Sequence, residues 1–347
     1  MGLLNSFLRS KLAESVVLID IGAGSVAGAY ARYEEDEAPA LLYTRRVPIE
    51  MREGEARERA MLRALEVLGG ILVREGAPTL ARATGSGRAD VILVSIDAPW
   101  QKTSIRIEHI EQENPFIFTK SLVTKALENR AAVPEKLLVD ESVIGTLLNG
   151  YETSNPYGKR AHRASVIVLT SLIEAKIAER VVSVLRSLYH TRHILTIASS
   201  SLRYQTMRAA FPHERNMLML DATGPVTSVI LVRNGFFVAV SEAADTDVES
   251  RSWVRTVTDE FAEIAKQYPL PRTIFLLARP SEMSSVRERL GAENFGSLWL
   301  SDNPPKIVPI LANQIGGTIR QGTAAAPDLA ITLMALYWHQ SGFKKET

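Results

Sequence analysis

Hydrophobic and polar positions in the first hundred residues follow two different periods. Short apolar runs separated by polar turns predict strands, whereas apolar residues at helical spacing with charges between them predict a long amphipathic helix. A Gly- and Ser-containing stretch after that helix predicts a mobile loop. The expected elements are strands at 16–21, 25–33 and 40–49, a helix at 52–73, the loop at 76–90 and a buried strand at 91–96.

The middle of the chain predicts a small α+β module and then a return to longer helices. The turn signature Asn155-Pro156-Tyr157-Gly158 separates two apolar runs within the module. The expected elements are a helix at 122–130, strands at 136–148 and 165–172, a helix at 174–188, a strand at 193–198 and a helix that ends at 211.

The second half of the chain repeats the opening plan. An apolar run leads into Asp221 and a turn, and Asn234-Gly235 is a strong hairpin signal in the β-rich stretch that follows. Pro327 is expected in the first turn of the last helix. The expected elements are strands at 217–220, 227–232, 236–240 and 273–277, and helices at 252–267, 283–290 and 326–340.

An aspartate stands at the end of the first strand in each half. Asp20 is followed by Ile-Gly-Ala-Gly-Ser, and Asp221 is followed by Ala-Thr-Gly-Pro. A carboxylate at a strand end can hold the water shell of a magnesium ion, and a glycine-rich turn presents backbone N–H groups to phosphate oxygens. Either turn alone is ordinary hairpin chemistry. The matched pair predicts a phosphate-binding site that lies between the two turns and is contacted by both.

Composition adds limits but selects no function. The 347 residues are 46% hydrophobic and 23% charged, which fits a globular chain large enough for two domains. A net charge of +1 provides no field that would attract nucleic acid, so we expect no nucleic-acid partner. The absence of cysteine excludes disulfides and thiolate chemistry. Neither a membrane-spanning stretch nor a cleavable signal is recognisable, so a cytoplasmic location is the default expectation.

The N-terminus carries an amphipathic pattern of its own. Its large apolar residues fall on one helical face, at Leu3, Leu4, Phe7, Leu8 and Leu12. Such a segment can lie on a membrane surface, dock on a partner or cover the protein's own surface, and the sequence leaves the three open.

Two further patterns favour ordinary structural roles. Gly22-x-Gly24-x-x-x-Gly28 approaches a dinucleotide fingerprint, but its third glycine is one residue late and a strand follows where that fingerprint needs a helix. His190-x-x-His193 has no completing ligand nearby, and we expect it to mark the end of a helix.

Taken together, the motifs resemble those of the actin-like ATPase superfamily, and in particular its bacterial FtsA and PilM branch. Residues 20–26, Asp-Ile-Gly-Ala-Gly-Ser-Val, resemble the first phosphate motif of that branch, and residues 221–227 stand where the second should be. Residues 139–159, with their Asn-Pro-x-Gly turn, are similar to the small subdomain of FtsA. The helix that starts with Ala-Pro-Asp at residue 326 is similar to the closing helix of the family.

The resemblance implies an α/β fold with two actin-like (ribonuclease H-like) lobes and a small α+β subdomain inserted in the first lobe. The expected boundaries are an N-terminal amphipathic segment at 1–14, a first lobe at 15–96 and 172–212, the inserted subdomain at 97–171, a second lobe at 213–325, and a closing helix and tail at 326–347.

The resemblance also implies a nucleotide, ATP with magnesium, in the cleft between the lobes. The residues expected to contact the nucleotide are Asp20, Gly22, Ala23, Gly24, Ser25, Asp221, Gly224 and Thr227. Asp20 and Asp221 would hold magnesium through water, and only if nucleotide binds.

In FtsA and PilM, the fold serves a scaffold that recruits partners beneath the inner membrane. The implied partners are membrane-anchored division or pilus proteins, bound through a short cytoplasmic peptide. Self-association is left open. So is a peripheral contact with the inner face of the plasma membrane through Leu3, Leu4, Phe7, Leu8 and Leu12.

Four departures from the family motifs predict that ATP binding is weak or absent. Ala27 stands where a phosphate-contacting lysine is usual, so a fixed positive charge is expected to be missing. Thr223 and Pro225 replace glycines, and proline has no N–H to donate to a phosphate. The two glycine pairs expected further on are replaced by Ser-Glu-Ala-Ala-Asp from residue 241 and by Ala-Arg-Pro from residue 278.

Losing one charge-assisted hydrogen bond costs about 1.5–3 kcal/mol, or tenfold and more in affinity. We therefore expect a scaffold without appreciable hydrolysis. The alternative is an active actin-like ATPase or a small-molecule kinase of the same superfamily.

Overall fold

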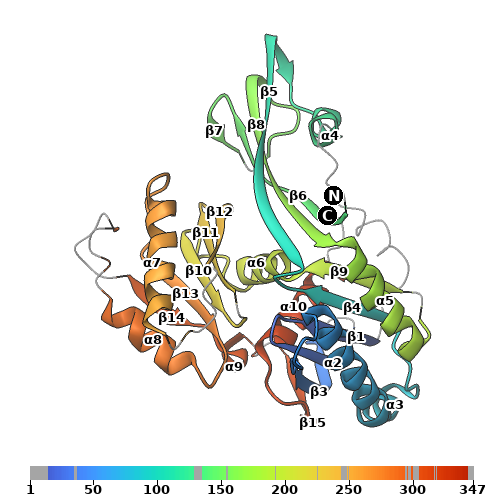
Figure 1. Cartoon of the computed structure of the whole chain (residues 1–347). Coiled ribbons are helices and arrows are strands. Elements are labelled where there is room, and N and C mark those ends of the chain that lie inside the picture. The colour runs from blue at the N-terminus through green and yellow to red at the C-terminus, as the bar shows by residue number, and fades with distance from the viewer. Residues whose placement is uncertain are drawn as a thin grey trace.

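The computed structural model of the chain describes residues 15–34, 37–128, 135–153, 155–191, 193–224, 226–243, 248, 250–293, 295, 298–299, 305–315, 317 and 319–342. The expected amphipathic segment at 1–14 lies outside the described residues, as does Pro225. Figure 1 shows two lobes side by side, with a long narrow sheet projecting above them.

The first lobe is built on a six-stranded sheet. Its strands are β1 (Ser15–Ile21), β2 (Ser25–Arg32), β3 (Ala40–Pro48), β4 (Val91–Ile96), β9 (Ile194–Ala198) and β15 (Arg320–Ala324). Their order is β15-β3-β2-β1-β4-β9: the first three strands of the chain run antiparallel, and β4 and β9 continue parallel to β1. The helical elements on the outer face are α2 (Arg57–Ile71), the π-helix η1 (Leu72–Gly76), α3 (Ala77–Thr84) and α5 (Ala175–Tyr189).

The second lobe repeats this arrangement on a five-stranded sheet. Its elements are β10 (Met217–Ala222), β11 (Thr227–Arg233), β12 (Phe236–Ala243), α7 (Arg251–Ala265), β13 (Thr273–Ala278), α8 (Met283–Ala292) and β14 (Lys306–Pro309). The order β12-β11-β10-β13-β14 matches β3-β2-β1-β4-β9, which confirms the repeated plan. Asn234 and Gly235 both have positive φ, as a tight hairpin turn requires. Trp253 and Phe261 of α7 are fully buried under this sheet.

The projecting subdomain has a sheet and a core of its own. Its elements are β5 (Gln101–Ile117), α4 (Lys120–Glu128), β6 (Lys136–Leu148), β7 (Tyr151–Glu152) and β8 (Arg160–Glu174), in the order β5-β8-β6-β7. The helix packs through Val123 on an apolar cluster that includes Phe118, Val166 and Val168. The longest strand, β5, was not among the expected elements.

Two helices lie between the lobes and join them. They are α6 (Ser199–Ala210) and α10 (Leu329–Gly342), preceded by the short α9 (Ala312–Ile315). One apolar cluster contains Leu18 of β1, Met207 of α6, Met219 of β10 and Leu333 of α10. Before α10, the chain adds β15 to the edge of the first lobe's sheet, although residues 320–324 were expected in the second lobe. No helix within the described residues is long and apolar enough to cross a membrane.

The expected loop at 76–90 is wrong over its first half. The chain instead continues from α2 through η1 into α3, which ends at the left-handed Gly85. Leu72 and Leu80 are fully buried, so the apolar face of the helix continues past the expected end. Gly76 provides close approach and not mobility, because a Cβ there would lie 2.6 Å from the ring of Tyr30.

The last helix also begins later than expected. Its first residue is Leu329, so Pro327 precedes the helix and does not lie in its first turn. The carboxylate of Asp328 accepts a hydrogen bond from the backbone N–H of Ile331 at 3.1 Å, which is the geometry of an N-cap.

Candidate functional site

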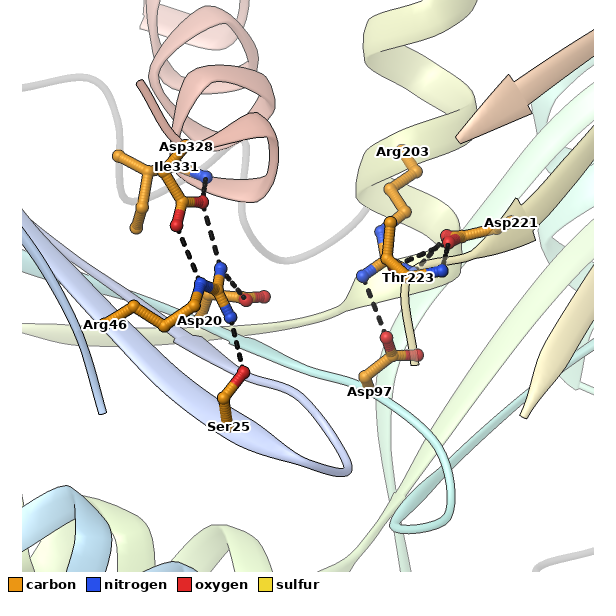
Figure 2. Close-up of polar contacts among 9 residues, drawn as sticks. All are labelled: Asp20, Ser25, Arg46, Asp97, Arg203, Asp221, Thr223, Asp328 and Ile331. Carbon is orange, nitrogen blue, oxygen red and sulfur yellow. Dashed lines mark hydrogen bonds and ion pairs between the residues drawn. The ribbon is translucent and has the colours of Figure 1, made fainter. Parts of the chain in front are cut away.

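Two hairpins place an aspartate at equivalent positions in the two lobes. Asp20 lies opposite Ala27 in the β1–β2 pair, and Asp221 lies opposite Ser228 in the β10–β11 pair. Each aspartate is the next-to-last residue of its strand, and both are buried, at 3% and 2% exposure. Figure 2 shows the two strand ends in the same region of the molecule.

A third aspartate joins them, which the sequence analysis missed. Asp97 follows β4, the parallel neighbour of β1, and its backbone N–H donates to the carbonyl oxygen of Ile21 at 2.9 Å. It is 7% exposed. A signal for it exists in the sequence, because Val91–Ile96 followed by Asp97 repeats the strand-then-aspartate pattern of the other two turns.

The guanidinium of Arg203 lies between two of these carboxylates (Figure 2). Arg203 is on α6 and is 6% exposed. Its Nη2 donates to Asp97 Oδ2 at 2.8 Å, and its Nη1 forms an ion pair with Asp221 Oδ2. One arginine therefore connects a strand end of the first lobe to a strand end of the second.

A second arginine holds the third carboxylate. Arg46 of β3 contacts Asp20 Oδ2 at 3.2 Å, donates to Ser25 Oγ at 2.7 Å, and binds both oxygens of Asp328 at 2.7 and 2.9 Å. The β2–β3 register places Arg46 directly opposite Ala27. The expectation that Ala27 leaves this turn without a positive charge is therefore wrong, because the neighbouring strand supplies one.

Burial and pairing set the protonation of this group. Burial raises the pKa of Asp20 and of Asp97 above the usual range, and the nearby guanidinium groups oppose that shift. Burial alone would lower the pKa of Arg203, but the carboxylates of Asp221 and Asp97 raise it, so this arginine stays charged. Two guanidinium groups pair with four carboxyl groups, which leaves the cluster acidic when every carboxyl is ionised.

The residues here do not fit magnesium held through Asp20 and Asp221. An oxygen of each carboxylate contacts a guanidinium group, and that fixed positive charge would lie beside any divalent ion placed there. The other oxygen of Asp221 accepts from the backbone N–H of Thr223 at 3.0 Å and from its hydroxyl at 2.6 Å. Among the residues that the structure describes, no set of three or more acidic or histidine side chains is placed to hold a metal ion.

The other expected nucleotide contacts divide into two groups. At the first turn, the N–H of Gly22 donates to the carbonyl oxygen of Ser25 at 3.0 Å, Ala23 is buried, and the carbonyl oxygen of Gly24 accepts from Ile49 at 2.9 Å. At the second turn, Gly224 is partly exposed.

Thr227 is 1% exposed, and its hydroxyl accepts from the indole N–H of Trp253 at 2.8 Å. Thr227 therefore contacts the core of the second lobe. The expected contacts of the first turn do lie together: Asp20, Gly22, Ala23, Gly24 and Ser25.

The two patterns expected to be structural have that role. Gly28 is within β2, where a Cβ would lie 2.5 Å from Leu72, so the glycine serves close packing between strand and helix. His190 ends α5 in a left-handed conformation, and its N–H donates to the carbonyl oxygen of Arg186.

Neither a scan of protein-family models nor a search of curated proteins finds a match to this chain. Among solved structures, a chain of the PilM–PilN type IV pilus biogenesis complex is 14% identical, covering 95% of this chain and 99% of that one, with a TM-score of 0.57. This chain has the actin-like ATPase fold. A protein of unknown function with that fold from Bacteroides thetaiotaomicron is 8% identical, covering 93% of this chain and 96% of that one, with a TM-score of 0.49.

Proposed function

We propose that this actin-like chain is an FtsA- or PilM-like cytoplasmic scaffold that binds partner proteins at the inner membrane, in cell division or pilus assembly. Its ATP binding is weak or lost. The likeness in fold to a chain of a pilus biogenesis complex supports the scaffold role, because that neighbour is itself part of a protein–protein assembly.

The pairing of the strand-end carboxylates supports the proposal that ATP binding is weak or lost. Asp20 contacts Arg46, and Asp97 and Asp221 both contact Arg203, so the strand-end carboxylates are already paired within the chain itself. A triphosphate entering here would meet an acidic cluster whose two guanidinium groups are held by carboxylates. The replacement of turn glycines by Thr223 and Pro225 acts in the same direction.

Calorimetry of the full chain with ATP and magnesium tests the loss of nucleotide binding. We expect no saturable heat at micromolar nucleotide and no phosphate release above the rate without protein. A low-micromolar Kd together with turnover would contradict the proposal and favour the ATPase or kinase alternative. A low-micromolar Kd without turnover would leave a nucleotide-regulated scaffold and remove only the claim about ATP.

Binding of partner peptides tests the scaffold role. Cytoplasmic peptides of membrane-anchored division and pilus proteins encoded near this chain can be immobilised and probed with the purified protein. We expect one of them to bind saturably, to compete with its own free form, and to bind equally with and without magnesium and ATP. Binding that requires ATP, or the absence of binding by every such peptide, would contradict the proposal.

Membrane contact is tested separately with vesicles that contain anionic lipid. The full chain is expected to sediment with the vesicles, and a variant that lacks residues 1–13 is expected to sediment less. Equal sedimentation of the two proteins would exclude Leu3, Leu4, Phe7, Leu8 and Leu12 as the membrane contact.

A further inference from the structure

A buried side chain, that of Arg203, links a strand-end carboxylate of one lobe to a strand-end carboxylate of the other. Arg203 is the only residue in Figure 2 that contacts carboxylates from both lobes: Asp97, which follows β4, and Asp221, which is in β10. All three side chains are buried, with exposures of 6%, 7% and 2%. A buried charge pair of this kind is stable only when its hydrogen bonds are complete.

The second oxygen of each carboxylate has a hydrogen-bond donor in its own turn. Oδ1 of Asp97 accepts from the backbone N–H of Ala98 at 2.8 Å, which leaves Oδ2 for Arg203. Oδ1 of Asp221 accepts from the N–H and the hydroxyl of Thr223, which leaves its Oδ2 for the same guanidinium. Each carboxylate is therefore held by its own turn as well as by Arg203, and all of these contacts come from the chain itself.

The contacts of Arg203 with Asp97 and Asp221 lie where they would resist separation of the two lobes. The apolar cluster around α6 and α10 joins the lobes along their facing sides, whereas Arg203 joins the ends of β4 and β10. A movement that separates the strand ends of the two lobes would pull Asp97 away from Asp221. The guanidinium would then lose one of its two buried partners, which is costly because the other charge is left unpaired.

We propose that Arg203 acts as a built-in cation that fixes the two lobes in one arrangement without nucleotide or metal. In a two-lobed clamp, a bound ligand can supply such a link by contacting both lobes. Here the chain supplies it permanently, so the relative position of the lobes is set by folding. This inference goes beyond the proposed scaffold role and does not require it.

Interlobe distances test this directly, because the chain contains no cysteine and can be labelled at chosen sites. Spin labels at Glu66→Cys in α2 and Glu288→Cys in α8 report on one lobe each, and both positions are exposed. The distance distribution is measured by pulsed electron spin resonance in the otherwise unchanged chain, in Arg203→Ala and in the control Arg186→Ala, an exposed arginine of α5.

The unchanged chain and the control are expected to give one narrow distribution that ATP and magnesium do not alter. Arg203→Ala is expected to broaden the distribution and shift it to longer distances. Guanidinium ion at low millimolar concentration should restore the narrow distribution in Arg203→Ala only, by filling the vacated position. A narrow, unshifted distribution in Arg203→Ala would overturn the proposal.

A triple variant covers the case in which Arg203→Ala does not fold. Arg203→Met combined with Asp97→Asn and Asp221→Asn removes the charges of Arg203 and of its two carboxylate partners while keeping the side-chain volumes similar. The proposal expects this variant to fold and to show the broad distribution, without a response to guanidinium ion. A narrow distribution in the triple variant would show that the shared apolar core alone fixes the lobes. ATP calorimetry on the unchanged chain is independent of these outcomes, so the proposed function and this inference can fail separately.

Discussion

At the scale of single residues, Thr227 was expected to contact a nucleotide but instead stabilises the core of the second lobe. Its hydroxyl accepts a hydrogen bond from the indole N–H of Trp253. Both side chains are buried, so solvent cannot replace this acceptor if the hydroxyl is removed. Thr227→Val keeps the side-chain volume and removes the acceptor. We expect a loss of about 1–3 kcal/mol in the free energy of unfolding, measured with urea. Thr227→Ser keeps the hydroxyl and should lose clearly less, so equal losses in the two variants would contradict this role.

Tyr30 predicts a response to alkaline pH. Burial raises its pKa to about 12, above the ordinary value of 10.0. The contribution of the buried Tyr30 phenol to the free energy of unfolding is fully present below about pH 10, because the phenol is then neutral in the folded and the unfolded chain. As pH rises from about 10 to 12 only the unfolded chain loses the proton, so stability falls, by about 3 kcal/mol in total.

Tyr30→Phe should therefore weaken the fall in the urea midpoint between about pH 10 and pH 12. It should not abolish the fall, because burial also raises the pKa of Tyr337 to about 12. Tyr151→Phe, at a position that is 80% exposed, is the matched control and should leave the pH profile unchanged. A Tyr30→Phe profile that overlays the unchanged chain would show that this phenol does not limit alkaline stability.

At the scale of elements, the start of α10 depends on Asp328 in two ways. Its carboxylate caps the helix through the N–H of Ile331 and binds the guanidinium of Arg46 from the first lobe's sheet. Asp328→Ala removes both and should cost about 1–2 kcal/mol for the cap, plus less than about 1 kcal/mol for the partly exposed ion pair. Asp328→Asn keeps a capping oxygen and should cost less than half as much. Similar losses in the two variants, measured by urea unfolding, would assign the effect to the charge.

Most elements could be predicted from the sequence because their apolar spacing is unambiguous. The strands β4 and β6 have the expected bounds, and β1, α7 and β13 lie within one or two residues of theirs. In β5, apolar Ile105 and Ile107 alternate with Arg106 and Glu108, but most of the run is polar, so apolar spacing alone does not predict the strand. Much of β5 is indeed exposed, because it is the edge strand of a narrow projecting sheet.

The candidate site was less predictable than the fold. The aspartates at strand ends are visible as local motifs, and Asp97 could have been found in the same way. Their partners are not local. Arg46 reaches its place through the β2–β3 register, and Arg203 through the packing of α6 between the lobes, so neither is adjacent in sequence to the carboxylates that it binds. Local motifs can thus reveal absent glycines but not the arginines that pair with the carboxylates.

At the scale of the whole molecule, the distribution of the cores predicts which parts unfold together. The two lobes share one apolar cluster through α6 and α10, whereas the outer half of the subdomain has a separate cluster under α4. Leu333 of α10, at 1% exposure, belongs to the shared cluster, and Phe118, at 0% exposure, belongs to the separate one. Removing either side chain leaves a cavity, but the two cavities lie in different cores.

Leu333→Ala should cost about 2–5 kcal/mol, and Phe118→Ala about 3–5 kcal/mol in the core that contains it. Hydrogen exchange read by mass spectrometry distinguishes the two. Leu333→Ala should speed exchange in β1 and β10 alike, because both strands pack on the shared cluster. Phe118→Ala should speed exchange in α4 and in the adjoining ends of β5 and β8, and leave β1 and β10 protected. If Phe118→Ala exposed β10 as much as β8, the subdomain would be part of the same cooperative unit as the lobes, and the division into two cores would be wrong.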